Sequence, residues 1–262
     1  MAGFRINRVS EDIRREIIAI IRELKDPRVM GKMLTVVRVE VASDASFAKV
    51  YVSDLKGIDS AKEAVKGLTA ATGMDALTHA IEGYITGGAW ELSDMFHIKA
   101  IEIIAKSLKG ATEGCPKCLE GMALGQYIAG MGFSNVGLGI VHSMAHPLGA
   151  LYDTPHGIAN AIILPTVMEY NAPATGEKYR DIAKAMGVEG TDAMSIEDAR
   201  KAAIDAVKQL SIDVGIPADL KEIVKAEDIP FLAQSAFDDA CRPGNPRDTS
   251  VEEITALYNS LI

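Results

Sequence analysis

The apolar periodicity of the chain changes once, near residue 68, and this change constrains the fold more than any other feature of the sequence. Before it, a helical repeat of isoleucine and leucine is followed by two runs rich in β-branched residues, at 33–41 and 47–55. After it, most segments repeat their apolar residues at the spacing of amphipathic helices. The sequence therefore predicts a mainly α protein, with a small α/β unit over residues 1–68 and an all-helical domain over residues 69–262.

The α/β unit is predicted to contain one helix and a β-hairpin. In "VSEDIRREIIAIIRELKDPRV" the apolar residues fall at helical spacing, with Ser10 as the expected N-cap and Pro27 as the expected stop. "MLTVVRVEV" and "FAKVYVSDL" alternate β-branched with polar residues, and the short segment "ASDAS" joins them as a hairpin.

The helical domain carries its own capping signals. Ser250 and Glu253 in "SVEEITALYNSLI" have the spacing of a capping box, and "SIEDARKAAIDAVKQL" also opens on a capping serine. In "ELSDMFHIKAIEIIAKSL" four apolar residues are expected on one face of a helix: Met95, Ile98, Ile101 and Leu108.

Composition excludes a membrane span and a disulfide-rich secreted scaffold. The longest apolar stretch is broken by Gln, Asn, His and Pro, which is typical of buried helices. The chain has three cysteines, an odd number, and no signal peptide is recognised at its start. These features predict a cytoplasmic location.

Charge is divided unevenly between the two parts. Residues 1–68 carry 13 Lys and Arg against 10 Asp and Glu, whereas the whole chain has a net charge of −9. A basic head on an acidic body suggests a different partner for each, although chance variation between solvated faces gives the same picture.

Three of the five histidines lie in one short segment, "VHSMAHPLGALYDTPHG": His142, His146 and His156. His79 follows Asp75 by four residues, so on a helix the two side chains share a face and can point at one ion. A carboxylate oxygen combined with imidazole nitrogens suits Fe(II) or Zn(II). Spacing alone does not choose between His142 and His146, and capping or core histidines are the structural alternative.

Two further patterns favour structural interpretations. Cys115-Pro-Lys-Cys118 is a single CxxC, without the second pair of a zinc knuckle or the preceding strand of a thioredoxin-type site, so a loop between helices is favoured. Acidic residues interleave the arginines that could contact phosphates, which is typical of a solvated helix face. Those arginines are Arg5, Arg8, Arg14, Arg15 and Arg22.

From Thr69 to the C-terminus the chain resembles the iron-dependent alcohol dehydrogenases. The resemblance is carried by "TAATGMDALTHAIEGYI", by "GMALGQYIAGMGFSNVGLGIVHSMAHPLGALYDTPHGIANAIILPTVMEYN" and by "NPRDTSVEEI". It implies the helical metal-binding domain of that family. The metal ligands that it implies are Asp75, His79, His142 and His156.

The resemblance also implies the chemistry of the site. His146 corresponds to a non-ligand histidine near the nicotinamide and substrate, and is the expected catalytic residue. Phe133, Leu138 and Cys241 are the expected lining of the substrate pocket. A divalent metal, Fe(II) before Zn(II), would polarise the oxygen of a small alcohol or aldehyde such as 1,2-propanediol or lactaldehyde while NAD(P) exchanges a hydride.

The nicotinamide site implied by the family is largely missing from this sequence. Family members hold the nucleotide mainly with a Rossmann-like domain and its glycine-rich loop. Here Gly137-x-Gly139 is followed three residues later by His142, and no strand is expected before it, so it fails as a dinucleotide fingerprint. We therefore expect the oxidoreductase activity of the chain to be impaired.

Residues 1–68 resemble the ribosome-binding factor A family, small KH-type proteins of 30S ribosome maturation. "RINRVSEDIRREIIAIIRELKDPRV", "LTVVRVEVASDASFAKVYVSDL" and "AKEAVKGL" carry this resemblance, which covers part of the KH-like fold. The two families meet at Ala71-Thr72-Gly73, where the KH-type proteins have a kink. Because one helix cannot easily dock on both parts, we expect the helical domain, with more apolar surface to bury, to retain it.

Three functions follow: a metal-dependent oxidoreductase domain, which is the favoured prediction; an RNA- or ribosome-binding protein; and a chimera that only binds metal. The expected partners are a small alcohol or aldehyde and a weak RNA or ribosome contact, with no membrane. A homo-oligomer is left open.

Overall fold

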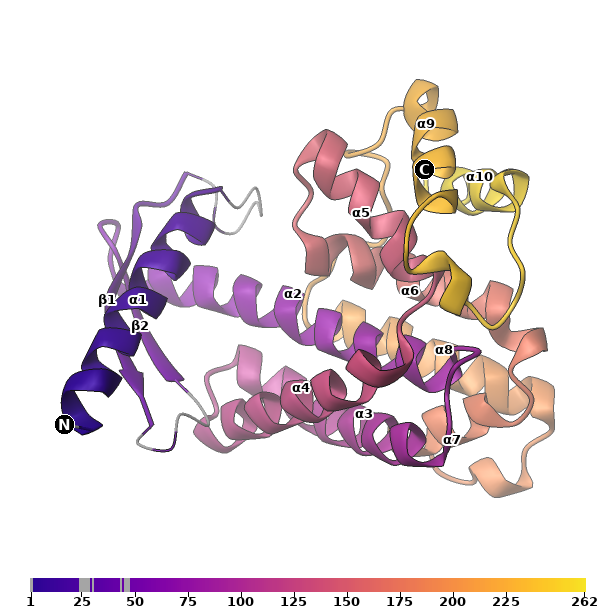
Figure 1. Cartoon of the computed structure of the whole chain (residues 1–262), viewed down its shortest axis with the longest axis horizontal. Helices are drawn as coiled ribbons and strands as arrows, with labels where there is room; N and C mark the ends of the chain where they lie inside the picture. Colours follow the sequence, from indigo (N-terminus) through magenta and orange to yellow (C-terminus); the bar gives the residue numbers. More distant parts are fainter. Residues whose placement is uncertain (1, 24–28, 30, 43, 45–47) are drawn as a thin grey trace. The chain divides into compact units, whose positions relative to one another are not determined.

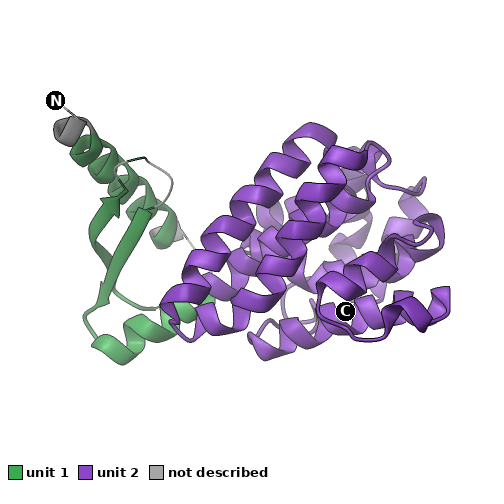
Figure 2. Ribbon diagram, turned by 90° about the horizontal axis from the view of Figure 1, so that it is seen from below, with its two compact units in different colours: residues 1–68 green, residues 69–262 purple. Residues whose placement is uncertain are grey.

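The structure is a computed structural model that describes residues 2–23, 29, 31–42, 44 and 48–262 (Figure 1). The chain divides into two compact units, Met1–Leu68 and Thr69–Ile262 (Figure 2). Across the described residues helices dominate and the only sheet has two strands, so the prediction of a mainly α protein is confirmed.

Unit 1 consists of a helix and an antiparallel hairpin followed by the start of a second helix. The predicted strands are present as β1 (Leu34–Val41) and β2 (Ala48–Asp54). Their pairing shifts between Val36 and Arg38, a β-bulge that leaves Val37 unpaired and exposed. The connecting turn falls largely outside the described residues.

The first helix, α1 (Ala2–Glu23), begins well before the predicted N-cap. Ser10 lies inside the helix, where its hydroxyl donates to the carbonyl of Ile6, so the prediction that it caps the helix is wrong. A serine flanked by acidic residues has the composition of a cap, but its hydroxyl can equally bond a carbonyl four residues back. Pro27, the predicted stop, lies outside the described residues. One side of α1 packs on the hairpin through Ile13, Ile17 and Ile21.

Helix α2 (Ile58–Ile85) crosses the boundary between the two units without a break. Ala64 is fully buried in the small core of unit 1, whereas Met74 and Leu77 are fully buried in the core of unit 2. At about 1.5 Å per residue, a 28-residue helix is long enough to serve both cores with different segments. The C-terminal part of α2 is buried in the helical domain, as expected. The N-terminal part of the same helix packs in the core of unit 1, so the expected competition of the two units for one helix does not arise.

Unit 2 is built only from helices and short 3-10 turns. Its helices pack around one apolar core, and α3 and α4 lie along each other (Figure 1). In addition to the end of α2, they are α3 (Glu91–Thr112), α4 (Pro116–Val136), α5 (Ile140–Tyr152), α6 (His156–Asn171), α7 (Lys178–Ala185), α8 (Ile196–Asp213), α9 (Ile229–Phe237) and α10 (Val251–Asn259).

The capping predictions for unit 2 are confirmed. Ser250 and Glu253 form a capping box at the start of α10, and Ser195 accepts the backbone N–H of Asp198 at the start of α8. The predicted apolar face of α3 is correct for Ile101 and Leu108, which are fully buried, but wrong for Met95, which is 70% exposed. Met95 lies near the start of α3, where the apolar repeat continues although the core does not cover this position.

Cys115 and Cys118 form a disulfide at the start of α4. The favoured interpretation of the CxxC as a loop between helices is correct only for Cys115, since Pro116 to Cys118 form the first turn of α4. The cysteine count gave no indication of the bond. Among the described helices, none combines the length and the apolar character required to cross a bilayer.

Candidate metal centre

The candidate metal-binding side chains come from three helices of unit 2. Asp75 and His79 lie one turn apart in α2, His142 and His146 one turn apart in α5, and His156 begins α6. Helix α6 approaches α2 closely at Gly157, where a Cβ atom would overlap the carbonyl of Ala71. The absence of a side chain at Gly157 therefore lets His156 and Asp75 face each other.

Asp75, His142 and His156 point their ligand atoms into one small volume. A carboxylate oxygen of Asp75 lies 3.6 Å from Nε2 of His156 and 4.0 Å from Nε2 of His142. All three ligand atoms fall within 4.8 Å of one another, a spacing that a single transition-metal ion can bridge. The structure thus brings together three of the four residues that the family resemblance implies as ligands.

The fourth implied ligand, His79, lies against this cluster. Its ring centre is 4.2 Å from that of His142. Its Nδ1 is 2.8 Å from the backbone carbonyl of Asp75, a contact that fixes Nδ1 as the protonated nitrogen and leaves Nε2 free to bind a metal. Burial, reinforced by the neighbouring His142, lowers the pKa of His79 despite the opposing charge of Asp75. A neutral imidazole is the form that binds a metal.

His142 is the most buried of these side chains, and a buried carboxylate orients its ring. Its Nδ1 lies 2.6 Å from Oε2 of Glu82, and both side chains are 2% exposed. Its Nε2 is buried without a hydrogen-bond partner among the described residues. Because a buried polar atom is seldom left without a partner, this nitrogen fits the place of a metal ligand.

Glu82 also fixes the start of α5. Its Oε1 accepts the backbone N–H of Val141 at 2.7 Å, and its Oε2 lies 3.4 Å from the N–H of His142. The negative charge therefore lies at the positive end of the α5 dipole, which favours it electrostatically. One carboxylate thus positions both the helix and the side chain that the helix carries.

Asn160 contacts two of the candidate ligands, Asp75 and His156. Its amide nitrogen donates to Oδ1 of Asp75 at 2.6 Å and lies 3.0 Å from Nε2 of His156. Burial lowers the pKa of His156, with Asp75 opposing this shift and His142 adding to it. A bound ion would replace the contact between Asn160 and His156, while the bond to Asp75 would remain.

His146 belongs to a different group of side chains. Its Nδ1 lies 2.7 Å from Oδ2 of Asp239, and its ring stacks on that of His156 with the ring centres 5.5 Å apart. Burial pushes the pKa of Asp239 upwards, but the backbone N–H of Cys241 and the His146 imidazole outweigh it and leave the pKa below its usual value. The structure thus separates His142 from His146, which spacing alone could not do: His142 joins Asp75 and His156, whereas His146 pairs with Asp239.

The three residues implied as a substrate pocket lie at different distances from this centre. Phe133 lies against the fourth implied ligand, with its ring centre 4.4 Å from that of His79. Cys241, His146 and Asp239 each offer one atom that could bind a metal, and these three atoms lie within 4.8 Å of one another. Burial, with the charge of Asp239, raises the pKa of the Cys241 thiol to about 12. Leu138 lies in the link between α4 and α5, with its carbonyl close to Gly244.

Sequence reasoning missed three residues of this site: Glu82, Asn160 and Asp239. Two had a signal that went unused, since Glu82 follows His79 by three residues and Asn160 follows His156 by four, so each shares a helix face with a candidate ligand. Asp239 had none, because its partner His146 is 93 residues away.

The glycines around residue 137 have a structural role at the end of α4. Gly137 ends α4 with a φ of 82°, in the left-handed region that glycine tolerates. No strand occurs between residues 69 and 262, all of which are described. The residues around Gly137 therefore do not have the strand-loop-helix arrangement of a dinucleotide pyrophosphate loop.

In unit 1, the arginines that could reach nucleic acid are partly committed to contacts within the protein. Arg14 is 3.1 Å from Glu11 through Nε and donates to the carbonyl of Val36 through Nη1. Arg8 and Arg15 are exposed. The side chains of Arg5 and Arg22 lie outside the described residues.

Comparison with known proteins places the helical part of the chain in a known family. The sequence profile of the Fe-containing alcohol dehydrogenase family, C-terminal, matches residues 69–262. Lactaldehyde reductase of Escherichia coli is 64% identical over 194 residues, which are 74% of this chain and 50% of that protein. 1,3-propanediol dehydrogenase of Citrobacter freundii is 48% identical over 194 residues, with 73% and 50% covered.

Solved structures show the same relationship. A 1,3-propanediol oxidoreductase superposes with a TM-score of 0.73 at 46% identity, covering 75% of this chain and 52% of the other. An alcohol dehydrogenase from Oenococcus oeni gives a TM-score of 0.74 at 41% identity, covering 78% and 54%. The chain thus spans about half the length of the relatives it matches.

The N-terminal part matches a second family. The profile of ribosome-binding factor A covers residues 5–78, so the two matches overlap within α2, over residues 69–78. This overlap agrees with the interpretation of the chain as a chimera. Since the first profile covers most of the chain and includes every candidate metal ligand, the chain belongs to the Fe-containing alcohol dehydrogenase family.

Proposed function

We propose that residues 69–262 bind one divalent transition metal through Asp75, His79, His142 and His156 and act as the metal-binding part of an alcohol dehydrogenase. The observation that carries the proposal is the convergence of Asp75, His142 and His156 around the unpartnered, buried Nε2 of His142. A mixed oxygen and nitrogen donor set suits Fe(II) first, in keeping with the family, and Zn(II) as an alternative.

Hydrogen bonds from neighbouring groups would orient the proposed ligands towards the ion. Glu82 holds the proton on Nδ1 of His142, and the Asp75 carbonyl holds the proton on Nδ1 of His79, so Nε2 of each ring is left as the acceptor that would bind the ion. Asn160 restrains the Asp75 carboxylate through Oδ1. With three imidazoles and one carboxylate bound, the ion would retain one positive charge, enough to attract the oxygen of a substrate.

A divalent ion in such a site supplies Lewis acidity, which polarises the oxygen of an alcohol or aldehyde. His146 would hold or move the proton of the substrate hydroxyl, with Asp239 orienting its imidazole from the far side through Nδ1. Phe133, packed on His79, would supply an apolar wall. We propose small alcohols and aldehydes such as 1,2-propanediol and lactaldehyde as substrates, since one relative is named lactaldehyde reductase.

Metal analysis of single variants tests this proposal. Purified wild-type protein loaded with Fe(II) or Zn(II) should retain one equivalent per chain after gel filtration. Asp75→Ala and His156→Ala should each lose most of it, because three ligands leave an open and weakly held ion. Asp59→Ala is the matched control, since Asp59 is an exposed carboxylate on the same helix α2. Full metal retention by both site variants would disprove the assignment.

A second function, RNA binding by unit 1, is favoured by the ribosome-binding factor A match over residues 5–78. The interleaved charges and the internal contacts of Arg14 argue for a weak, electrostatic interaction. Binding of small-subunit RNA by this chain should therefore fall steeply with salt and show little preference over an unrelated RNA. A complex that resists salt and selects its sequence would contradict this expectation.

A further inference from the structure

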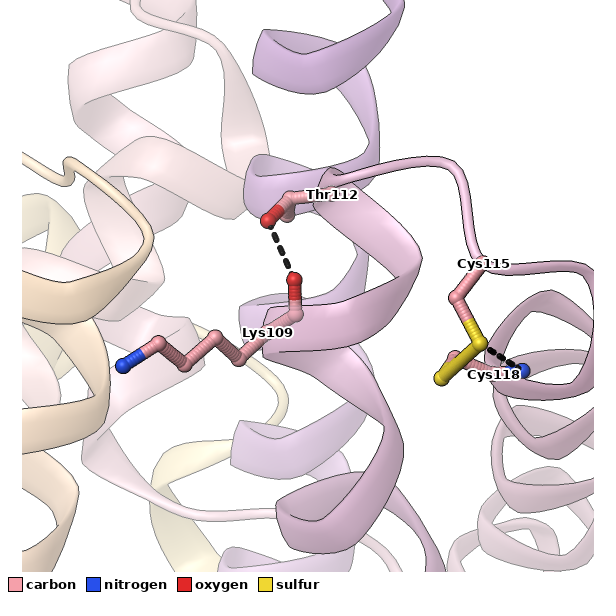
Figure 3. The surroundings of a disulfide bond; sticks show 4 residues. All are labelled: Lys109, Thr112, Cys115 and Cys118. Atoms are coloured by element: carbon pink, nitrogen blue, oxygen red, sulfur yellow. Dashed lines mark hydrogen bonds between the residues drawn. A yellow bond between two sulfur atoms is a disulfide. The ribbon is translucent and has the colours of Figure 1, made fainter.

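The Cys115–Cys118 pair is the motif that the metal centre leaves unexplained. The two residues form a disulfide at the start of α4, with their Cα atoms 5.2 Å apart (Figure 3). This Cα separation is in the usual range for a disulfide, so the bond can form and open without movement of the backbone.

The position of the bond argues against a role as a structural crosslink. It joins residues only three positions apart, and a disulfide restricts the unfolded chain least when the loop it closes is short. The helices on either side already share a buried apolar contact, with Leu108 of α3 and Met122 of α4 in the same core. In reducing compartments, disulfides of proteins are mostly catalytic or redox-sensing.

The helix end provides a reason for reactivity. Cys115 is the N-cap of α4, Pro116 occupies the first turn, and Sγ of Cys115 accepts the backbone N–H of Cys118 at 3.3 Å (Figure 3). The first turn of this 21-residue helix contains no acidic residue to offset the positive end of its dipole. Both features stabilise a thiolate on Cys115 and make it the better nucleophile at neutral pH.

The surroundings of the two sulfur atoms differ. Cys115 follows the link after α3 and has no part in the apolar core of unit 2, whereas Cys118 packs against that core. Gly110 of α3 leaves room for Cys118, since a Cβ there would overlap its Sγ. Both cysteines are half-buried, but only Cys118 packs against the core, so Cys115 at the helix end is the sulfur that we assign to attack first.

We infer that Cys115 and Cys118 form a thiol–disulfide exchange site, with Cys115 as the attacking thiolate and Cys118 as the resolving thiol. The reaction partner is a disulfide of the glutathione class. The Cys115 thiolate attacks one sulfur of the partner, forming a mixed disulfide and releasing one thiol. Cys118 then loses its proton and attacks Sγ of Cys115, forming the 115–118 bond and releasing a second thiol. Two thiols of the protein are oxidised and one partner disulfide is reduced to two thiols.

The chain contains its own control for this inference. Cys241, the third cysteine, has a pKa raised to about 12 by burial and by Asp239, and it precedes only a three-residue 3-10 turn instead of an α-helix. It should therefore remain a thiol under conditions in which Cys115 reacts. The comparison within one polypeptide removes differences in folding or concentration.

The experiment uses the full chain after reduction and removal of the reductant, without added metal. Peptide mass spectrometry follows alkylation of each cysteine against pH, and oxidised glutathione is then added to wild type, Cys118→Ser and Cys115→Ser. We expect the alkylation of Cys115 to titrate at least about one pH unit below the usual thiol value of about 8.5. Cys118→Ser should accumulate a glutathione adduct on Cys115, whereas wild type should pass through it and regain the 115–118 bond with release of two glutathione thiols.

Two results would overturn the inference. One is a Cys115 titration at or above the usual thiol value. The other is adduct formation at equal rates on Cys115 in Cys118→Ser and on Cys118 in Cys115→Ser, because this would show two ordinary exposed thiols. Circular dichroism of both serine variants verifies that α4 is retained.

Discussion

Nδ1 of His142 lies 2.6 Å from a carboxylate oxygen of Glu82, and the two side chains are buried together although 60 residues separate them in the chain. This pair defines which nitrogen of His142 faces the candidate metal. It also places a carboxyl group in the core, where backbone N–H groups at the start of α5 and the imidazole of His142 are its hydrogen-bond partners. The carboxylate therefore orients a proposed ligand without being one itself.

Replacement of Glu82 by glutamine should weaken metal binding while the fold is retained. Glutamine has the same size, but its neutral amide no longer raises the basicity of His142 or fixes its tautomer. Loss of such an outer partner typically costs about 10- to 100-fold in metal affinity. Competition with a chromophoric chelator measures the change, and Asp59→Asn on the exposed part of α2 is the matched control. Equal affinities of Glu82→Gln and wild type would show that the pair is only structural.

Alanine at Gly157 should disturb both stability and metal binding. Its Cβ would overlap the carbonyl of Ala71 and press on Cβ of Asp75 at 3.3 Å, so α6 and α2 must separate. Overpacking of this kind costs about 1–3 kcal/mol. Gly130→Ala in α4 is the control, since nothing lies within 4 Å of its added Cβ, and there alanine should stabilise by about 0.5–1 kcal/mol. Urea unfolding gives both values, and opposite signs are expected for the two variants.

His97 should make the stability of the chain depend on acid. Its ring is fully buried between Gly83 and Gly132, and neither nitrogen has a hydrogen-bond partner among the described residues. Burial, assisted by the charge of Lys178, lowers its pKa to about 4. Because the folded pKa lies below the unfolded value of about 6.5, the neutral ring contributes its full stability above pH 6.5, and this contribution is lost as pH falls towards 4.

The loss amounts to about 3 kcal/mol between these two pH values. His97→Leu removes the titration, so its free energy of unfolding should change less with pH than that of wild type. The difference between the two proteins, measured by urea unfolding at several pH values, isolates His97 from the other acid-sensitive groups. Parallel pH profiles would contradict the prediction.

Oxidation of 1,2-propanediol by this chain alone should be close to background, even when metal is bound. Hydride transfer requires the two reacting carbons to be held about 3–3.5 Å apart. The residues present do not fit the dinucleotide loop that would position the nicotinamide, and His146 and Phe133 offer contacts near the metal only. The assay follows absorbance of the reduced nicotinamide with metal-loaded protein, with E. coli lactaldehyde reductase as the positive control. Turnover comparable to that control would contradict the prediction and show that the chain positions the nicotinamide with other residues.

The sequence by itself determined the local features of this protein. The two strands, the caps at Ser195 and Ser250 and the helical nature of residues 69–262 follow from periodicities and side-chain chemistry that act over a few residues. The spacing of Asp75 and His79 identified one half of the candidate site for the same reason. Local patterns misled where they had two solutions, as at Ser10, whose hydroxyl bonds a carbonyl inside α1 and does not cap it.

Only the tertiary structure decided which distant groups meet. The distinction between His142 and His146 depends on Glu82 and Asp239, which lie 60 and 93 residues from them in the chain. The same holds for α2, whose two ends are buried in different cores. Periodicity reports how a residue relates to its own helix or strand, whereas the packing of whole elements sets hydrogen bonds, burial and pKa shifts across the fold.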